Sequence, residues 1–193
     1  VGGVAGIVPD KTTTMKIDKC SNTTPEGANA KNIVEVTTEN TVAGNHIGGA
    51  FGYITSASNA AISVTNCKNE ANVKLNAKVT TVSYAGGLIG YMKTATASMG
   101  TIENCENDGA VNVNITYPEG SSIGGQYAGI AGVFSNSKSF KNNHNRANGD
   151  ITVNGTFGAN LVVMGCTTGS PNTSDCSNAG DIDVYGTQTG GTV

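Results

Sequence analysis

Apolar and polar residues alternate in four related segments of the chain, at residues 66–75, 104–113, 144–153 and 175–184. In the first segment Val73 and Leu75 flank Lys74, and an equivalent apolar–polar–apolar triplet closes each of the other three. A period of two places the apolar side chains on one face of a β-strand and the polar ones on the other. The pattern therefore predicts a short strand at the same place in each segment.

A second, glycine-rich apolar segment recurs between these alternating segments. It reads GGVAGIV at 2–8, GGAFGYI at 48–54, GGLIGYM at 86–92, AGIAGVF at 128–134 and LVVMGCT at 161–167. Together with a strand that leads into the alternating segment, the two motifs give each of five imperfect repeats three predicted strands.

The repeat determines the predicted fold. A single repeat cannot bury the apolar face of its own strands, so successive repeats must stack at the strand spacing of about 4.8 Å. We therefore expect an all-β, parallel β-helix or β-solenoid of about five coils, with three strands in each coil. The usual handedness of parallel crossovers predicts a right-handed coil, and variation in repeat length predicts loops along one edge.

Residues 1–193 are expected to form a single β-solenoid domain. Versions of the glycine motif stand at both ends of the sequence, VGGVAG at 1–6 and TGGTV at 189–193. This arrangement predicts that the chain is a segment of a longer repeat array.

Alignment of the repeats on their alternating strands places Cys20, Cys67, Cys105, Asn145 and Cys176 in one column. Stacking then predicts a structural ladder of buried thiols, since the thiol is small and behaves as an apolar group, with Asn145 replacing one rung. The cysteines are one repeat apart and form no C-x-x-C pair, which favours core packing. A disulfide or a metal site remains an alternative, although no cofactor or metal is expected.

A further column consists of Asn69, Asn107 and Asn178. Asparagine tolerates turn geometry and can bond to the backbone, so this column is expected at a corner of the coil.

The glycine-rich strand is apolar on both of its faces, which makes it the best candidate for an interaction surface. One face must fill the interior, and the other is either covered by loops or another domain or forms an exposed stripe that binds a partner. The side chains assigned to this candidate surface are Phe51, Tyr53, Ile89 and Tyr91.

Composition narrows the possible functions. The chain carries 13% charged residues and a net charge of -3, and no basic patch that would attract nucleic acid. It contains no apolar run of eighteen residues, so direct membrane insertion is not expected. Only His46 and His144 could serve as a histidine base. Neither lies in a recognised catalytic motif, and a surface or turn role is expected for both.

Three carboxylates suggest a different possibility. Asp150 and Asp181 are expected to stack on successive coils, with Asp183 two residues along. Such a group could hold calcium or serve a glycan-active enzyme. Solvated polar positions on a strand explain these residues equally well, and the G-G-x-G-x-D calcium motif is absent.

The segment Gly87-Leu88-Ile89-Gly90 resembles the GLUG motif, a short repeat of large bacterial surface proteins that include immunoglobulin A peptidases and adhesin-like chains. The resemblance covers all five copies, although the fourth lacks the cysteine and the fifth lacks two glycines. It implies an extracellular or cell-surface location. It also implies that the repeats are spacers or adhesive stalks and that any peptidase chemistry resides in another domain.

We therefore expect a non-enzymatic structural or adhesive module, a stiff spacer whose edge loops contact a host or bacterial surface protein, a glycan, or other domains of the same chain. The alternative is a glycan-binding or glycan-cleaving β-helix domain that resembles polysaccharide lyases and hydrolases. A shared cleft holding Asp150, Asp181, Asp183, His144 and Arg146 would favour the enzyme, and scattered solvated positions would favour the spacer.

Overall fold

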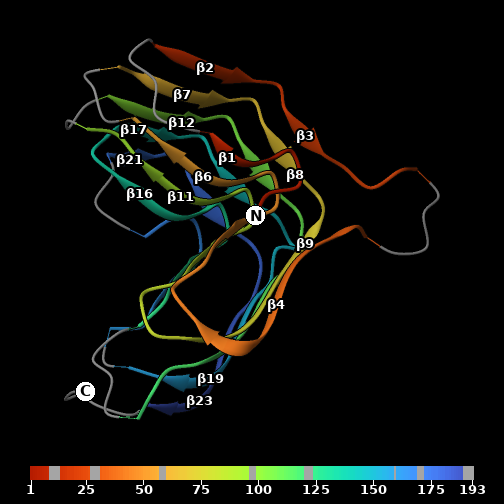
Figure 1. Ribbon diagram of the computed structural model, residues 1–193. Helices are drawn as coiled ribbons and strands as arrows, with labels where there is room; N and C mark the ends of the chain where they lie inside the picture. The colour runs from red at the N-terminus through yellow and green to blue at the C-terminus, as the bar shows by residue number, and fades with distance from the viewer. Residues whose placement is uncertain are drawn as a thin grey trace.

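The computed structural model of the chain is an all-β solenoid built from parallel strands (Figure 1). It describes residues 1–8, 14–26, 31–56, 60–95, 99–119, 124–158, 160–168 and 172–188. Within these ranges there is no helix, and so none long and apolar enough to cross a membrane. The predicted fold class, a parallel β-solenoid, is confirmed. The TGGTV segment at 189–193 lies outside the described residues.

The strands form five sheets, which we number in the order in which the chain enters them. Sheet 1 contains β1 (Ala5–Val8), β6 (Phe51–Thr55), β11 (Ile89–Lys93) and β16 (Ala131–Ser135). Sheet 2 contains β2 (Met15–Asp18), β7 (Ile62–Thr65), β12 (Gly100–Glu103), β17 (Ser137–Lys141) and β21 (Thr173–Ser174). Sheet 3 contains β3 (Ser21–Asn22), β8 (Lys68–Asn69), β13 (Glu106–Asn107), β18 (His144–Asn145) and β22 (Ser177–Asn178). Sheet 4 contains β4 (Ile33–Val42), β9 (Asn72–Val79), β14 (Val111–Thr116), β19 (Ile151–Phe157) and β23 (Ile182–Gln188). Sheet 5 contains β5 (His46–Gly48), β10 (Tyr84–Gly86), β15 (Gln126–Ala128) and β20 (Val162–Met164).

The number of strands in each repeat differs from the prediction. The three predicted strands exist, but the glycine-rich segment bends after its first glycine and is divided between sheets 5 and 1. A two-residue strand in sheet 3, which follows the cysteine position, was not predicted. A repeat therefore contributes to five sheets and not to three, because short strands separated by bends let the chain turn several corners.

Equivalent residues of successive repeats lie directly over one another. In sheet 4, Val73 pairs with Val111, which pairs with Ile151, and Ile151 pairs with Ile182. These columns match the predicted ones. The alternation of β9, with Val73 and Leu75 buried and Lys74 at the surface, confirms which face of the strand fills the interior.

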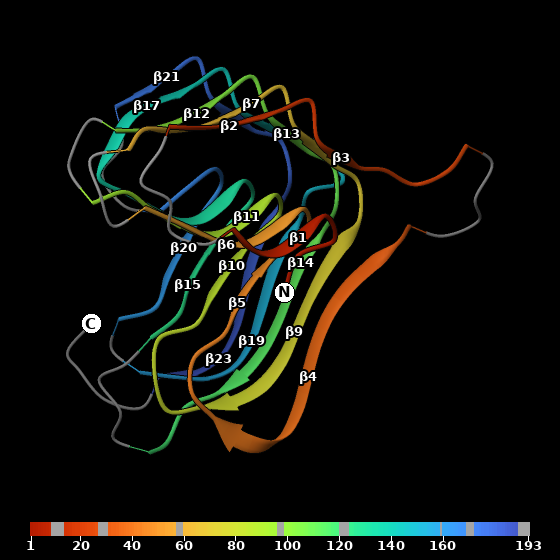
Figure 2. The same ribbon diagram turned by 45° about the horizontal axis from the view of Figure 1, so that its top comes forward.

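The interior is divided into two hydrophobic cores, one in each lobe of the cross-section (Figure 2). The first core lies between sheets 4 and 5 and contains Leu75, Val113 and Tyr127. The second lies between sheets 1 and 2 and contains Ile54, Phe134 and Phe140. The sheets meet between these lobes at a narrow waist.

A ladder of buried asparagines crosses this waist along the stacking direction. The side-chain amide of Asn69 donates to Asn107 Oδ1 at 2.8 Å, that of Asn107 to Asn145 Oδ1 at 2.8 Å, and that of Asn145 to Asn178 Oδ1 at 2.7 Å. Asn69, Asn107 and Asn145 are fully buried. The predicted asparagine column therefore exists, and it includes Asn145 as an additional member.

Glycine is required opposite this ladder because the two walls of the waist nearly touch. A Cβ at Gly87 would lie 2.2 Å from Asn107 Cγ and 2.1 Å from the carbonyl oxygen of Gly129. Two neighbouring repeats make the same approach, through the pairs Gly49–Asn69 and Gly129–Asn145. The glycine motif and the alternating motif recur together because each supplies one side of this contact.

The cysteine column differs from the predicted one at its fourth rung. The register of sheet 3 places Asn107 opposite Asn145, so the residue that stacks on Cys105 is Asn143. Asn143 is fully buried, and its Oδ1 accepts a hydrogen bond from the Cys105 backbone amide at 3.0 Å. The assignment of Asn145 to the thiol ladder is therefore wrong. The pairing of β3, β8, β13, β18 and β22 leaves Cys20, Cys67, Cys105, Asn143 and Cys176 in one file.

The shift arises from two additional residues that follow Asn145. Asn145 is 38 residues after Asn107, whereas Ile151 is 40 residues after its partner Val111. A turn absorbs the difference, closed by a hydrogen bond from the Gly149 amide to the Arg146 carbonyl at 2.9 Å. An alignment without gaps, anchored on Ile151, moves every earlier residue of this repeat by two positions.

Candidate functional site

A groove on the outside of the solenoid is the most developed candidate site. Sheets 5 and 1 meet at an angle (Figure 2), and side chains from both sheets line one cavity at this junction. On the sheet 5 side the column consists of His46, Tyr84, Gln126 and Val162. On the sheet 1 side the column consists of Ile7, Tyr53, Tyr91 and Val133. The groove follows the stacking direction, because both walls are built from columns of equivalent residues.

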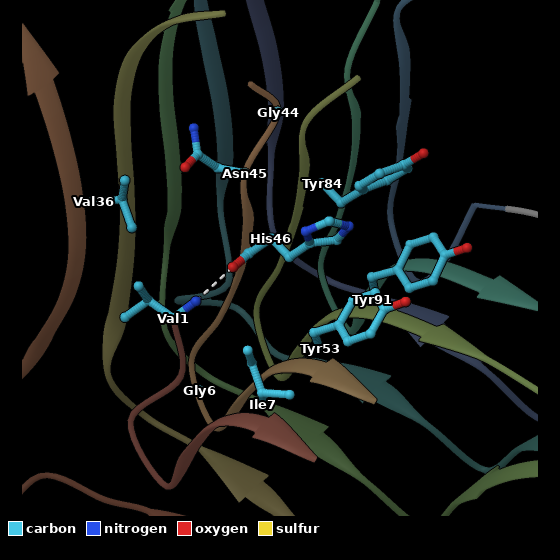
Figure 3. A pocket seen from close by; sticks show the side chains of 10 residues that line it. All are labelled: Val1, Gly6, Ile7, Val36, Gly44, Asn45, His46, Tyr53, Tyr84 and Tyr91. Carbon is cyan, nitrogen blue, oxygen red and sulfur yellow. Dashed lines mark hydrogen bonds between the residues drawn. The ribbon is translucent and has the colours of Figure 1, made fainter. Parts of the chain in front are cut away.

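Four aromatic rings form a continuous cluster across the groove (Figure 3). Tyr53 and Tyr91 stack with ring centroids 5.2 Å apart and planes 8° apart. His46 stacks on Tyr84 at 5.0 Å and meets Tyr53 edge-on at 4.9 Å. Tyr84 meets Tyr91 edge-on at 4.9 Å. These spacings are those of favourable aromatic pairs, so each ring is held in place by its neighbours.

The cluster lines a cavity of about 520 Å³. All four rings are half-buried, so part of each remains accessible to a ligand. Toward the first repeat the cavity is lined by Val1, Ile7 and Val36, and Asn45 adds an amide. Figure 3 shows the three tyrosine hydroxyls directed to one side, away from Val1 and Ile7. The cavity thus combines an apolar lining toward the first repeat with a row of tyrosine hydroxyl groups on the other side.

The lining is nearly free of charge. None of the ten residues that line the cavity is Asp, Glu, Lys or Arg. Burial lowers the pKa of His46 and raises the pKa values of Tyr84 and Tyr91, so the imidazole and both phenols are neutral at neutral pH. The amino group of Val1 lies at the edge and donates to the His46 carbonyl oxygen at 2.6 Å (Figure 3).

Only half of the predicted interaction surface lies at this site. Tyr53 and Tyr91 line the groove, but Phe51 is 2% exposed and Ile89 is fully buried, and both pack in the second core. The assignment of Phe51 and Ile89 to an exposed stripe is therefore wrong. Strict alternation does not hold along β6, because Phe51 and Ile54, three positions apart, are both buried in the second core.

Two contributors to the groove were not predicted as site residues. His46 was expected only in a surface or turn position, and Tyr84 was not considered. His46, Tyr84 and Gln126 each stand two residues before the first position of the glycine motif, whereas Val162 lies inside the fifth copy at 161–167, because Ala128 pairs with Met164. The equivalence of His46, Tyr84 and Gln126 could be predicted from the repeat. Their position opposite Tyr53 could not, because it depends on the angle between sheets 5 and 1.

The residues that would mark an enzyme do not lie in the groove, although Asp150 and Asp181 stack on successive coils as predicted. His144 bonds to Ser177 and Asn142, Arg146 pairs with Glu106, and Asp150 Oδ1 accepts from the backbone amide of Asp181. Asp183 pairs along sheet 4 with Thr152. None of these side chains lines the groove, and among the described residues no three His, Cys, Asp or Glu side chains cluster as a metal site would require.

The thiols differ in their access to solvent. Cys67 and Cys105 are at most 1% exposed, whereas Cys20, Cys166 and Cys176 are partly exposed. The hydrogen bond with Cys67, together with burial, raises the pKa of the Cys105 thiol well above its usual value. Burial also raises the pKa of Cys166 to about 11. All five cysteines are free thiols in this structure.

Alkylation should therefore separate the thiols into two classes. With N-ethylmaleimide at neutral pH, we expect Cys20 and Cys176 to be modified in the folded protein and Cys67 and Cys105 to react only after denaturation, since the reagent cannot reach a buried thiol. Peptide mass spectrometry before and after urea treatment measures this difference. Modification of Cys105 as fast as Cys20 in the native protein would contradict the buried file.

Comparison of the chain with protein-family models, curated proteins and solved structures found no match.

Proposed function

We propose that this chain is a non-enzymatic structural and adhesive repeat module of a secreted or cell-surface bacterial protein. It is a stiff, right-handed solenoid of about five coils. It binds a host or bacterial surface protein or a glycan, and it contacts other domains of the same chain. The resemblance of Gly87-Leu88-Ile89-Gly90 to the GLUG motif supports the cell-surface assignment.

The aromatic groove is the observation that carries this proposal. Four rings that contact one another in a cavity of about 520 Å³ form a preorganised binding surface on a rigid scaffold. Such a surface binds ligands through stacking and hydroxyl contacts. The stacked coils hold it at a fixed distance from whatever anchors the protein.

The glycan-cleaving alternative has less support than binding. Glycoside cleavage uses a pair of carboxylic groups that face the scissile bond. Among the described residues that line the groove there is no carboxylate, and Asp150 is engaged with the backbone of the next coil. We therefore assign binding and not cleavage to the groove.

A solid-phase adhesion assay tests the proposal. Beads that carry the chain are applied to a printed array of host matrix proteins, mucins and bacterial and host glycans. We expect the beads to be retained on a subset of the spots. The double variant Tyr53→Ala/Tyr91→Ala should reduce this retention about tenfold or more, since stacking contacts are lost. Tyr185→Ala is the matched control, because Tyr185 is 57% exposed on β23 and does not line the groove.

Two results would count against the proposal. Retention that is identical for the groove variant and the wild type would remove the groove from the function. Release of new reducing ends from an arrayed glycan would favour the enzyme in its place.

A further inference from the structure

The chemistry of the groove restricts the ligand more narrowly than adhesion alone requires. Charged polymers are poor candidates, because none of the described residues that line the cavity is acidic or basic. Nucleic acids and acidic polysaccharides bind through cationic side chains that neutralise their charge.

An extended peptide is also a poor fit. Peptides that bind to β-sheets usually add a strand to an unpaired edge. At the aromatic cluster β6 and β10 have neighbours on both sides. Strand β6 pairs with β1 and β11, and β10 pairs with β5 and β15. Strand β5 is the end strand of sheet 5, and its outer edge is bonded to Val1: the Gly48 amide donates to the Val1 carbonyl at 3.0 Å, and Val1 N donates to the His46 carbonyl at 2.6 Å. The backbone there is already hydrogen-bonded between coils, so a peptide could use side-chain contacts only.

A sugar ring matches the groups that remain. Pyranose rings present C–H faces to aromatic rings and hydroxyl groups to hydrogen-bonding side chains. The cavity provides both kinds of partner, with the half-buried rings of Tyr53 and Tyr91 beside the imidazole of His46 and the amide of Asn45. Its volume of about 520 Å³ falls in the range of small-molecule sites and suits a short oligosaccharide segment.

The groove also has the shape of a chain-binding site. Its aromatic part follows the stacking direction through Tyr53 and Tyr91, whose centroids are 5.2 Å apart. Beyond Tyr84 the same column continues with Gln126, whose Oε1 accepts a hydrogen bond from the buried Thr168 Oγ1 at 3.3 Å, and neither residue lines the cavity. A short linear ligand can therefore lie along the axis beside the tyrosine rings, with the end of the cavity before Gln126.

We propose that the groove formed by His46, Tyr53, Tyr84 and Tyr91 binds an uncharged saccharide chain, with its sugar rings against the tyrosine rings. This inference rests on the proposed function, because it names the ligand class of the same site. Of the ligands named in the proposed function, which are surface proteins and glycans, it retains only the neutral glycans.

Titration followed by two-dimensional NMR tests the inference, because carbohydrate affinities are often weak. The probes are neutral trisaccharides (cellotriose, mannotriose and N-acetylchitotriose), the anionic trigalacturonic acid, and an uncharged proline-rich decapeptide. We expect at least one neutral trisaccharide to shift the backbone amide signals of Tyr53, Tyr84 and Tyr91 in a saturable way. The charged probe and the peptide should leave them unchanged.

Variants connect that binding to the aromatic rings. Tyr91→Ala should weaken neutral-saccharide binding about tenfold or more, since it removes one ring of the cavity lining and the partner on which Tyr53 is stacked. Tyr91→Phe keeps the ring and the fold and removes only the hydroxyl, so we expect a smaller loss of a few-fold. Tyr185→Ala should bind as the wild type does, and circular dichroism shows whether each variant is folded.

The outcomes separate this inference from the proposed function. Preferred binding of trigalacturonic acid or of the decapeptide overturns the neutral-saccharide inference, as does the absence of binding by every neutral probe and every neutral arrayed glycan. If arrayed proteins still retain the chain through Tyr53 and Tyr91, only the ligand class is wrong. If groove-dependent retention is absent as well, both proposals fail.

Discussion

Gly87→Ala is expected to destabilise the protein by about 4 kcal/mol or more, enough to prevent folding in a chain of ordinary stability. The added Cβ would lie 2.1 Å from a backbone carbonyl oxygen and 2.2 Å from Asn107 Cγ, and neither neighbour can move without shifting a whole coil. Urea unfolding monitored by far-ultraviolet circular dichroism measures the change in the free energy of unfolding. If the variant does not fold at all, the β-sheet spectrum is absent even without urea.

Gly6→Ala is the matched control for that variant. Gly6 occupies the glycine motif of the first repeat, and a Cβ there would meet nothing within 4 Å. We expect a stability within about 0.5 kcal/mol of the wild type. Equal stability of Gly87→Ala and Gly6→Ala would show that the waist is not as closely packed as described.

Asn107→Ala is expected to cost about 3 kcal/mol in the free energy of unfolding. The Asn107 side chain donates to the Gly109 carbonyl at 2.7 Å and to Asn145 Oδ1 at 2.8 Å, and it accepts from Asn69 Nδ2. Removing it leaves several buried polar groups without partners, and each such group costs about 1–3 kcal/mol. Thermal and urea unfolding should both show the loss.

An exposed asparagine in the same repeat provides the comparison. Asn114 also belongs to a column, and its amide donates to Asn76 Oδ1 at 2.8 Å, but both side chains are in contact with water. We expect Asn114→Ala to change the stability by no more than about 0.5 kcal/mol. A similar loss for Asn107→Ala and Asn114→Ala would mean that burial of the ladder contributes little.

The sheet 4 columns could be predicted because their signal is local and repeated. Val73, Val111, Ile151 and Ile182 each sit in an apolar–polar–apolar triplet, and a period of two determines which side chains face inward without knowledge of the rest of the fold. Parallel stacking follows from the repeat itself, since identical strands can bury their apolar faces only against copies of themselves.

The thiol file was predicted correctly where a cysteine marks the rung and wrongly in the fourth repeat, where none does. The two additional residues after Asn145 preserve the apolar triplet at Ile151, so an alignment anchored on that triplet misplaces the residues before it. Only the interstrand hydrogen bonds show that Asn145 continues the asparagine ladder and that Asn143 continues the thiol file.

The groove could be predicted only in part. The equivalence of Tyr53 and Tyr91 is visible in the repeat, and the structure places their rings together. Their contact with His46 and Tyr84 requires two sheets to meet at a particular angle, and no local pattern encodes that angle. The burial of Phe51 was missed because burial along β6 departs from strict alternation.

The uniform bonding between neighbouring coils also bears on how such a chain can evolve. Asn69, Asn107 and Asn145 are 38 residues apart and make the same contacts at each level. Unequal recombination that duplicates or deletes one unit would lengthen or shorten the molecule by about 4.8 Å and leave every remaining junction intact. Recombination in such a gene can therefore change the length of the protein without requiring a new contact between coils.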